Sequence, residues 1–234
     1  MAGAMRVGVA VAMALVVGMG GGLAAPIVVN PSFEADTFPT WPGYSSQGGN
    51  GPITGWTSST PTNTGLNPVV GGSAPFADNG TRPSASDVGQ TPNPTNGNQI
   101  AFIQAGAATS LRQLISGFDP FAWYVLDYRE NERNGQASTL VVAMDATTLV
   151  PAHTVRPVGG ANPYHFIRSA PFTLGSATAG TLSFTASSGG DNTVLLDNVK
   201  LTRISSNPIT PLFQDTFSDE FFRGDNNDIN SQIP

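Results

Sequence analysis

Cysteine is absent from the 234-residue sequence, and lysine occurs once, as Lys200. Without cysteine the chain can form no disulfide, zinc–thiolate site, iron–sulfur cluster or cysteine nucleophile. Basic residues number 10 against 16 acidic ones, which gives a formal net charge of −6. Nucleic-acid binding rests on clustered lysine and arginine, so the composition argues against a nucleic-acid partner.

The first segment of the chain has the pattern of a secretory signal peptide. Arg6 is the only charged residue before Glu34, and it is followed by an apolar run over 7–17 and then by small residues. This order predicts that residues 1–24 are a signal peptide, and therefore a secreted or cell-surface protein with no stable membrane span after cleavage. The alternative is an uncleaved anchor, because residues 7–29 carry no charge and are long enough to cross a bilayer.

Between residues 26 and 206 the sequence alternates between apolar and polar residues in short runs. In the run 181–187, Leu182 and Phe184 face one way and the serine and threonine residues face the other, which is typical of a half-buried strand. Many such runs, separated by glycine-rich turns and without an amphipathic helix, predict an all-β domain over residues 26–206, built as an antiparallel β-sandwich or barrel. The further runs are 53–57, 99–104, 109–115, 121–129, 138–144, 165–172 and 194–202.

Two segments depart from this alternation. Residues 37–98 contain only three charged residues and are rich in proline, glycine, serine, threonine and asparagine. A loop of this length inside a compact domain is usually functional or disordered, and the alternative is decoration at the edge of a sandwich. Residues 207–234 are interpreted as a linker followed by the acidic remnant of a further domain.

Asp197 is a carboxylate whose position in the pattern is unusual. Strand parity puts it on the same face as Leu195 and Val199, so its side chain is predicted to point inward. A buried carboxylate is costly unless it is paired or bound to a metal. Calcium, backbone amides and an arginine side chain are all suitable partners, and parity does not choose among them.

Five short motifs follow one another along the chain: Asn30-Pro-Ser-Phe-Glu34, Gly55-Trp56, the strand 100–104, the Tyr-x-Leu-x-Tyr strand 124–128 and Leu195-Leu-Asp-Asn-Val199. In this order they resemble the galactose-binding-like jelly rolls, which include the carbohydrate-binding modules attached to xylanases and cellulases. The resemblance implies a jelly-roll sandwich whose first and last strands meet. It also implies a structural calcium ion held by Glu34 and Asp197.

The same resemblance implies a carbohydrate ligand, either a polysaccharide or a glycan. Sugars stack on aromatic rings and are read by polar side chains. If the tyrosines of the strand 124–128 point inward, their neighbours point outward, although exposed aromatics can also simply cover edges. The predicted ligand-binding residues are Trp41, Tyr44, Gln104, Trp123, Asp127 and Arg129.

The leading hypothesis is therefore a secreted, non-catalytic, calcium-stabilised module that binds carbohydrate. The sequence has none of the common catalytic motifs, and its two histidines, His153 and His165, share no metal-ligand spacing. One alternative is a calcium-dependent small-molecule cyclase on the same fold, which would need a carboxylic acid in an aromatic-lined cavity. Another is a structural cell-surface or matrix protein. An open groove with exposed rings favours sugar binding, whereas a closed aromatic pocket favours the cyclase.

Overall fold

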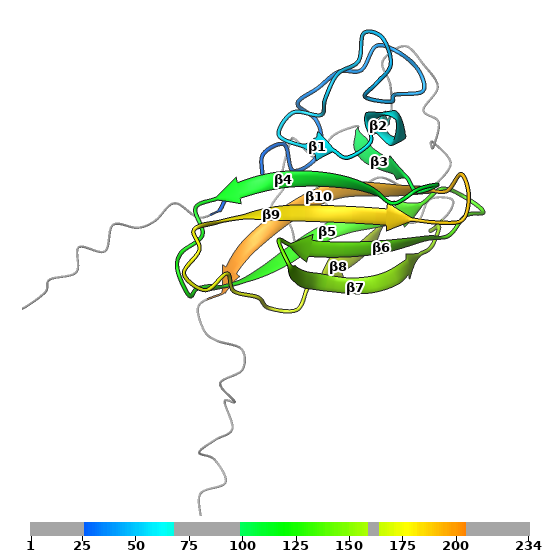
Figure 1. The fold of residues 1–234 in the computed structure, drawn as a ribbon. Helices are drawn as coiled ribbons and strands as arrows, with labels where there is room; N and C mark the ends of the chain where they lie inside the picture. The colour runs from blue at the N-terminus through cyan, green and yellow to red at the C-terminus, as the bar shows by residue number, and fades with distance from the viewer. Residues whose placement is uncertain (1–25, 68–98, 159–163, 205–234) are drawn as a thin grey trace, which may run out of the picture.

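Two antiparallel sheets pack face to face in the computed structural model, which describes residues 26–67, 99–158 and 164–204 (Figure 1). The first sheet consists, in spatial order, of β1 (Thr57–Ser58), β4 (Thr109–Ser116), β9 (Ala179–Ser187), β6 (Ser138–Met144) and β7 (Thr147–Val155). The second consists of β2 (Thr64–Asn67), β3 (Ile100–Gln104), β10 (Thr193–Ile204), β5 (Trp123–Glu132) and β8 (His165–Arg168). A single 3-10 turn, η1 (Pro61–Asn63), precedes β2.

The strand order is that of a jelly roll. If β3 to β10 are counted from one to eight, one sheet has the order 1-8-3-6 and the other has the order 2-7-4-5. Short strands β1 and β2 extend one edge of each sheet. The predicted all-β jelly-roll sandwich is therefore confirmed. Within the described ranges, no helix is long and apolar enough to cross a membrane.

The core between the sheets follows from the alternation in the sequence. In β9, Leu182, Phe184 and Ala186 are buried and their neighbours are half-buried, as predicted. In β5, Tyr124 and Tyr128 lie fully inside the same core. Six of the predicted strands correspond to strands of the structure besides β9; the run 138–144 matches β6 at both ends, and the other five have shifted ends.

Two predicted strands need correction, and two strands of the structure were missed. The run 53–57 is mostly a turn, in which Trp56 N donates to Ile53 O at 2.9 Å and Gly55 has a φ of 82°; only its last residue belongs to β1. The run 165–172 ends as a strand at Arg168, and Phe172 makes one isolated bridge. Strands β2 and β7 were not predicted. In β7 Pro151 interrupts the pattern, and the structure places this strand at a sheet edge, where a missing N–H is tolerated.

A β-bulge in β10 changes which way Asp197 points. At the bulge Asn198 has a φ of 54° and the pairing with β5 shifts. Leu196 before the bulge and Val199 after it both enter the main core, whereas Leu195 packs on the outer face of the sheet. Asp197 therefore does not share a face with Val199, which corrects the prediction from parity. Its side chain is nevertheless buried, at 1% exposed.

A side chain of β4 fixes the beginning of the described chain. The Gln113 carboxamide accepts from Val29 N at 2.7 Å and donates to Val29 O at 2.9 Å, as a neighbouring strand would. This pairing holds Val28 in the core. The predicted signal peptide (1–24), the predicted linker and acidic remnant (207–234) and residues 68–98 of the polar segment lie outside the described residues.

Candidate functional site

A loop carrying Tyr44 folds over the outer face of the second sheet. Tyr44 forms an isolated bridge with Gly65 of β2, and its ring meets Phe102 edge-on, with centroids 5.1 Å apart. A Cβ atom on Gly65 would lie 1.9 Å from Gly43 O, so only glycine allows this close approach. The contact forms part of a second, outer apolar cluster of Ile100, Phe102, Tyr164 and Leu195, with Tyr44 and Val158 packed against it.

Replacing Gly65 with alanine is expected to displace this loop. The added methyl group clashes with backbone, which cannot rotate away, so we expect a loss of about 1–3 kcal/mol in the free energy of unfolding. Urea denaturation measures this. Gly48→Ala is the matched control, because a Cβ there would meet nothing within 4 Å. Equal stability of the two variants would contradict the close approach.

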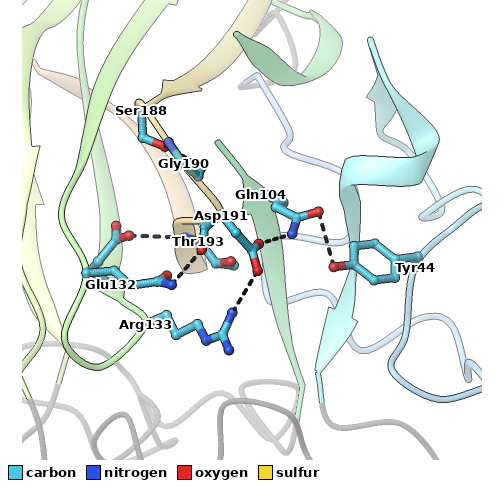
Figure 2. Close-up of polar contacts among 9 residues, drawn as sticks. Tyr44, Gln104, Glu132, Arg133, Ser188, Gly190, Asp191 and Thr193 are labelled. Carbon is cyan, nitrogen blue, oxygen red and sulfur yellow. Dashed lines mark hydrogen bonds and ion pairs between the residues drawn. The ribbon is translucent and has the colours of Figure 1, made fainter. Parts of the chain in front are cut away.

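A row of polar side chains continues from Tyr44 (Figure 2). The Tyr44 hydroxyl donates to Gln104 Oε1 at 3.2 Å, and Gln104 Nε2 donates to the Asp191 carboxylate. Arg133 Nη1 lies 3.5 Å from Asp191 Oδ2, and the two side chains are 42% and 66% exposed. We call these four residues the polar row. Gln104 ends β3, Arg133 follows β5 and Asp191 precedes β10, so three adjacent strands of one sheet contribute to it.

The polar row places hydrogen-bond acceptors and donors side by side next to an aromatic ring. A carboxylate accepts, a guanidinium donates, and together Asp191 and Arg133 suit two neighbouring hydroxyl groups, one donating and one accepting. Burial raises the pKa of the Tyr44 hydroxyl, and the charge of Asp191 raises it further. Tyr44 therefore stays protonated and keeps donating to Gln104.

A buried carboxylate holds the base of the polar row. Glu132, which is fully buried, accepts through Oε1 from Thr193 N at 3.1 Å (Figure 2). The same oxygen accepts from Ser138 Oγ at 2.8 Å. Thr193 is the register partner of Gln104. Burial raises the pKa of Glu132 to about 7. Glu132 thus links β5, β6 and β10 directly behind the row.

Trp41 lies in the same loop as Tyr44, three residues earlier in the chain. Its side chain is 56% exposed, and the bond to Pro42 is cis. The Asn50 carboxamide donates to Thr40 O and to Tyr44 O, both at 2.9 Å, which fixes the loop on either side of the tryptophan. Of the predicted ligand-binding residues, the structure thus brings Tyr44 and Gln104 into contact and puts Trp41 in the adjoining loop.

The structure places Trp123 at the other end of the sandwich. It begins β5, whereas Arg133 of the polar row follows the last residue of that strand. At about 3.3 Å per residue, the two ends of the strand are roughly 30 Å apart. Trp123 is half-buried there and does not join the row.

Asp127 and Arg129 lie on the outer face of β5, as parity predicts, but they are buried rather than open to solvent. Arg168 of β8 pairs with Asp127 through two contacts of 2.7 and 2.8 Å. Arg129, 7% exposed, lies over the Phe166 ring at 4.9 Å and donates to Tyr164 O at 3.4 Å. Strand β8 and the chain before it cover this part of the sheet, which the local pattern does not reveal.

Glu34 and Asp197, the two predicted calcium ligands, belong to segments that meet. Pro31 O accepts from Val199 N at 2.9 Å, just beyond the bulge that follows Asp197. Glu34 Oε1 accepts from Gln99 N at 2.5 Å, immediately before β3. Because β3 pairs with β10, both contacts bring the opening motif to the middle of β10, where the bulge lies.

The surroundings of the two carboxylates include a hollow beside Glu34 and a positively charged side chain, Arg129, beside Asp197. A hollow of about 240 Å³ is lined by Asn30, Pro31, Ser32, Glu34 and Ala35. Asp197 Oδ1 accepts from Asn198 N at 2.7 Å, and the register sets Arg129 directly opposite Asp197. Within the described ranges no group of three or more histidine, cysteine, aspartate or glutamate residues is arranged to hold a metal ion. An ion at this place would therefore depend on backbone oxygens as well as on the two carboxylates.

Sequence reasoning missed Arg133 and Asp191. Both lie in turns, and the turn patterns at 131–135 and 187–191 are the sequence signals that contain them. Which turns meet in space depends on the order of the strands in the sheet, and the sequence of one segment alone does not determine that order.

Comparison with known proteins found no matching family model and no matching curated protein. Solved structures similar to the chain include carbohydrate-binding modules. TmCBM61 in complex with beta-1,4-galactotriose is 12% identical over 75% of this chain and 96% of that one, with a TM-score of 0.41. The CBM22-1 xylan-binding domain from Paenibacillus barcinonensis Xyn10C is 12% identical over 75% and 93%, with a TM-score of 0.43. The enzymatically active domain of tailspike protein 4 from bacteriophage CBA120 is 14% identical over 76% of this chain, with a TM-score of 0.42, and this chain spans only 21% of it. The fold assignment rests on the strand order itself.

Proposed function

We propose that this chain binds carbohydrate at the polar row, with Tyr44 and the exposed Trp41 as its aromatic surfaces. The observation that carries the proposal is the contact chain from Tyr44 through Gln104 and Asp191 to Arg133. It combines a ring for the apolar face of a sugar with a paired acceptor and donor for its hydroxyl groups.

The charges favour a neutral glycan. Asp191 is the more exposed member of its ion pair, and the whole chain carries a net charge of −6. A uronic acid or a sulfated sugar would be repelled by the Asp191 carboxylate and by the negative net charge of the chain. A neutral sugar with two adjacent hydroxyl groups meets no such penalty.

The proposed function is binding without catalysis, by a secreted protein. The carboxylate beside the row, Glu132, is fully buried and already hydrogen-bonded, so it is not placed to transfer a proton to a ligand. Secretion is supported by the signal-peptide pattern of residues 1–24.

We further propose that calcium stabilises this module at Glu34 and Asp197. Carboxylate and backbone oxygens are the ligands that calcium prefers, and the Glu34 carboxylate lies beside a hollow that Asn30, Pro31, Ser32 and Ala35 also line. The ion would supply positive charge between two acidic side chains. Apart from any ion, the hydrogen bond from Val199 N to Pro31 O already ties the opening motif to β10.

Removing the polar row is expected to abolish glycan binding. We expect Tyr44→Ala and Gln104→Ala each to weaken binding to neutral polysaccharides at least about tenfold, since each loses a contact group at the centre of the site. Affinity electrophoresis in gels containing xylan, galactan or mannan, with polygalacturonate as the acidic comparison, measures this. Phe121→Ala is the matched control: its ring is 71% exposed but lies in the turn before β5, at the opposite end. Unchanged retardation of both row variants would rule out this site.

A further inference from the structure

A cavity of about 250 Å³ lies beside the short strands β1 and β2, separate from the polar row. Ile53 and Leu111 are its buried apolar members, and exposed Pro52 and Pro61 stand at its rim. Four hydroxyl-bearing residues complete the lining: Ser45, Thr57, Ser58 and Thr64. None of these lining residues carries a charge or an aromatic ring.

The Thr64 hydroxyl is buried without a partner among the described residues. Thr64 is fully buried, and its Oγ1 makes no hydrogen bond there. Its backbone carbonyl is satisfied by Ser45 N at 2.8 Å, and its register partner is Ile103, whose side chain lies in the core, so Thr64 points between the sheets. Buried hydroxyls in folded proteins almost always find a partner, and the described part of the chain supplies none to this one.

The lining defines what the cavity accepts. An ionised ligand would lose its hydration without gaining an opposite charge. A sugar ring carries more hydroxyl groups than this half-apolar lining can pair, and Ser58 Oγ already accepts from Thr60 N at 3.0 Å. The volume equals roughly eight water molecules, which suits a single small ring. These limits leave an apolar ring bearing one hydroxyl group.

We propose that this cavity is a binding site for a small, neutral aromatic alcohol, with the ring between Pro52, Pro61, Ile53 and Leu111 and the hydroxyl paired with Thr64. The site is distinct from the proposed glycan site and does not depend on it. Because no lining residue is ionisable, the function is binding and not acid–base catalysis.

Saturation-transfer NMR on the full chain, with benzyl alcohol and toluene as probes, tests the proposal. Wild type is expected to bind both at millimolar concentration and to prefer benzyl alcohol by roughly fivefold, the effect of about one hydrogen bond. Thr64→Val has the same shape without the hydroxyl, so it should bind both probes equally. Its melting temperature should stay the same or rise, because an unpaired buried group is removed.

Blocking the rim provides the second test. Thr57→Trp adds a large ring at an exposed lining residue and is expected to abolish both signals, whereas Thr62→Trp, exposed nearby but not in the lining, should keep them. Tyr44→Ala should also keep them, which separates this site from the glycan site. No signal with wild type, a signal that survives Thr57→Trp, or a preference for benzyl alcohol that survives Thr64→Val would each overturn the proposal.

Discussion

Raising the pH from about 5 to about 8 is expected to cost the native state about 3 kcal/mol through Glu132 alone. Burial raises the pKa of this carboxyl group from 4.5 to about 7, and the nearby Glu130 contributes to the rise. Between these values the folded chain holds a proton that the unfolded chain releases. The stabilisation is therefore complete below about pH 4.5 and is lost as the pH rises through 7.

Urea denaturation at a series of pH values, for wild type and Glu132→Gln, measures this effect. Glutamine keeps an oxygen that accepts from Thr193 N and Ser138 Oγ but does not titrate, so the variant should lose most of the slope. Asp191→Asn is the control, because that carboxylate is largely exposed and should leave the slope in place. A Glu132→Gln profile parallel to that of wild type would show that the buried carboxyl group does not govern the pH response.

Chelation of calcium is expected to lower the melting temperature by roughly 10 °C, if the ion is present at about a thousandfold above its Kd. Such an excess stabilises the native state by about 4 kcal/mol, and each kcal/mol shifts the melting temperature of a domain of this size by about 2–4 °C. Differential scanning calorimetry with and without EDTA measures the shift. The same shift should disappear in Asp197→Asn.

The control for the calcium experiment is Asp145→Asn, which makes the same chemical change at the β6–β7 turn. Asp145 Oδ1 accepts from Thr181 N of β9, in the sheet that does not contain Asp197, so this variant should keep the full response to EDTA. The register also offers Arg129 as the neutralising group of Asp197. In that case wild type would not respond to EDTA, and Asp197→Asn would lower the melting temperature equally with and without it.

Alternation was sufficient to predict the sandwich because most strands bury one face in a shared core. Leu182 and Phe184 of β9 show this period directly. The structure also puts Tyr124 and Tyr128 in the core, a placement that the sequence pattern left only as a condition. The prediction failed at Asp197 because a bulge adds one residue, and one added residue reverses the face of everything beyond it.

The candidate site was harder to predict than the fold. Tyr44 and Gln104 were named from their residue types, but their contact depends on a loop that crosses β2 at Gly65. Asp127 and Arg129 have suitable chemistry and the predicted face, and yet neighbouring chain covers them. Whether a side chain on the outer face of a sheet is buried depends on segments that are distant in the sequence. The local alternation of polar and apolar residues therefore cannot predict it.

The position of the polar row in turns has a practical consequence for protein engineering. Two of its residues, Arg133 and Asp191, lie outside the strands, while the framework beneath is held by Glu132 and by the jelly-roll core. A combinatorial library that randomises the turns 133–136 and 188–191 would therefore vary recognition while leaving the scaffold unchanged. Selection from such a library would yield binders of new specificity without redesign of the hydrophobic interior.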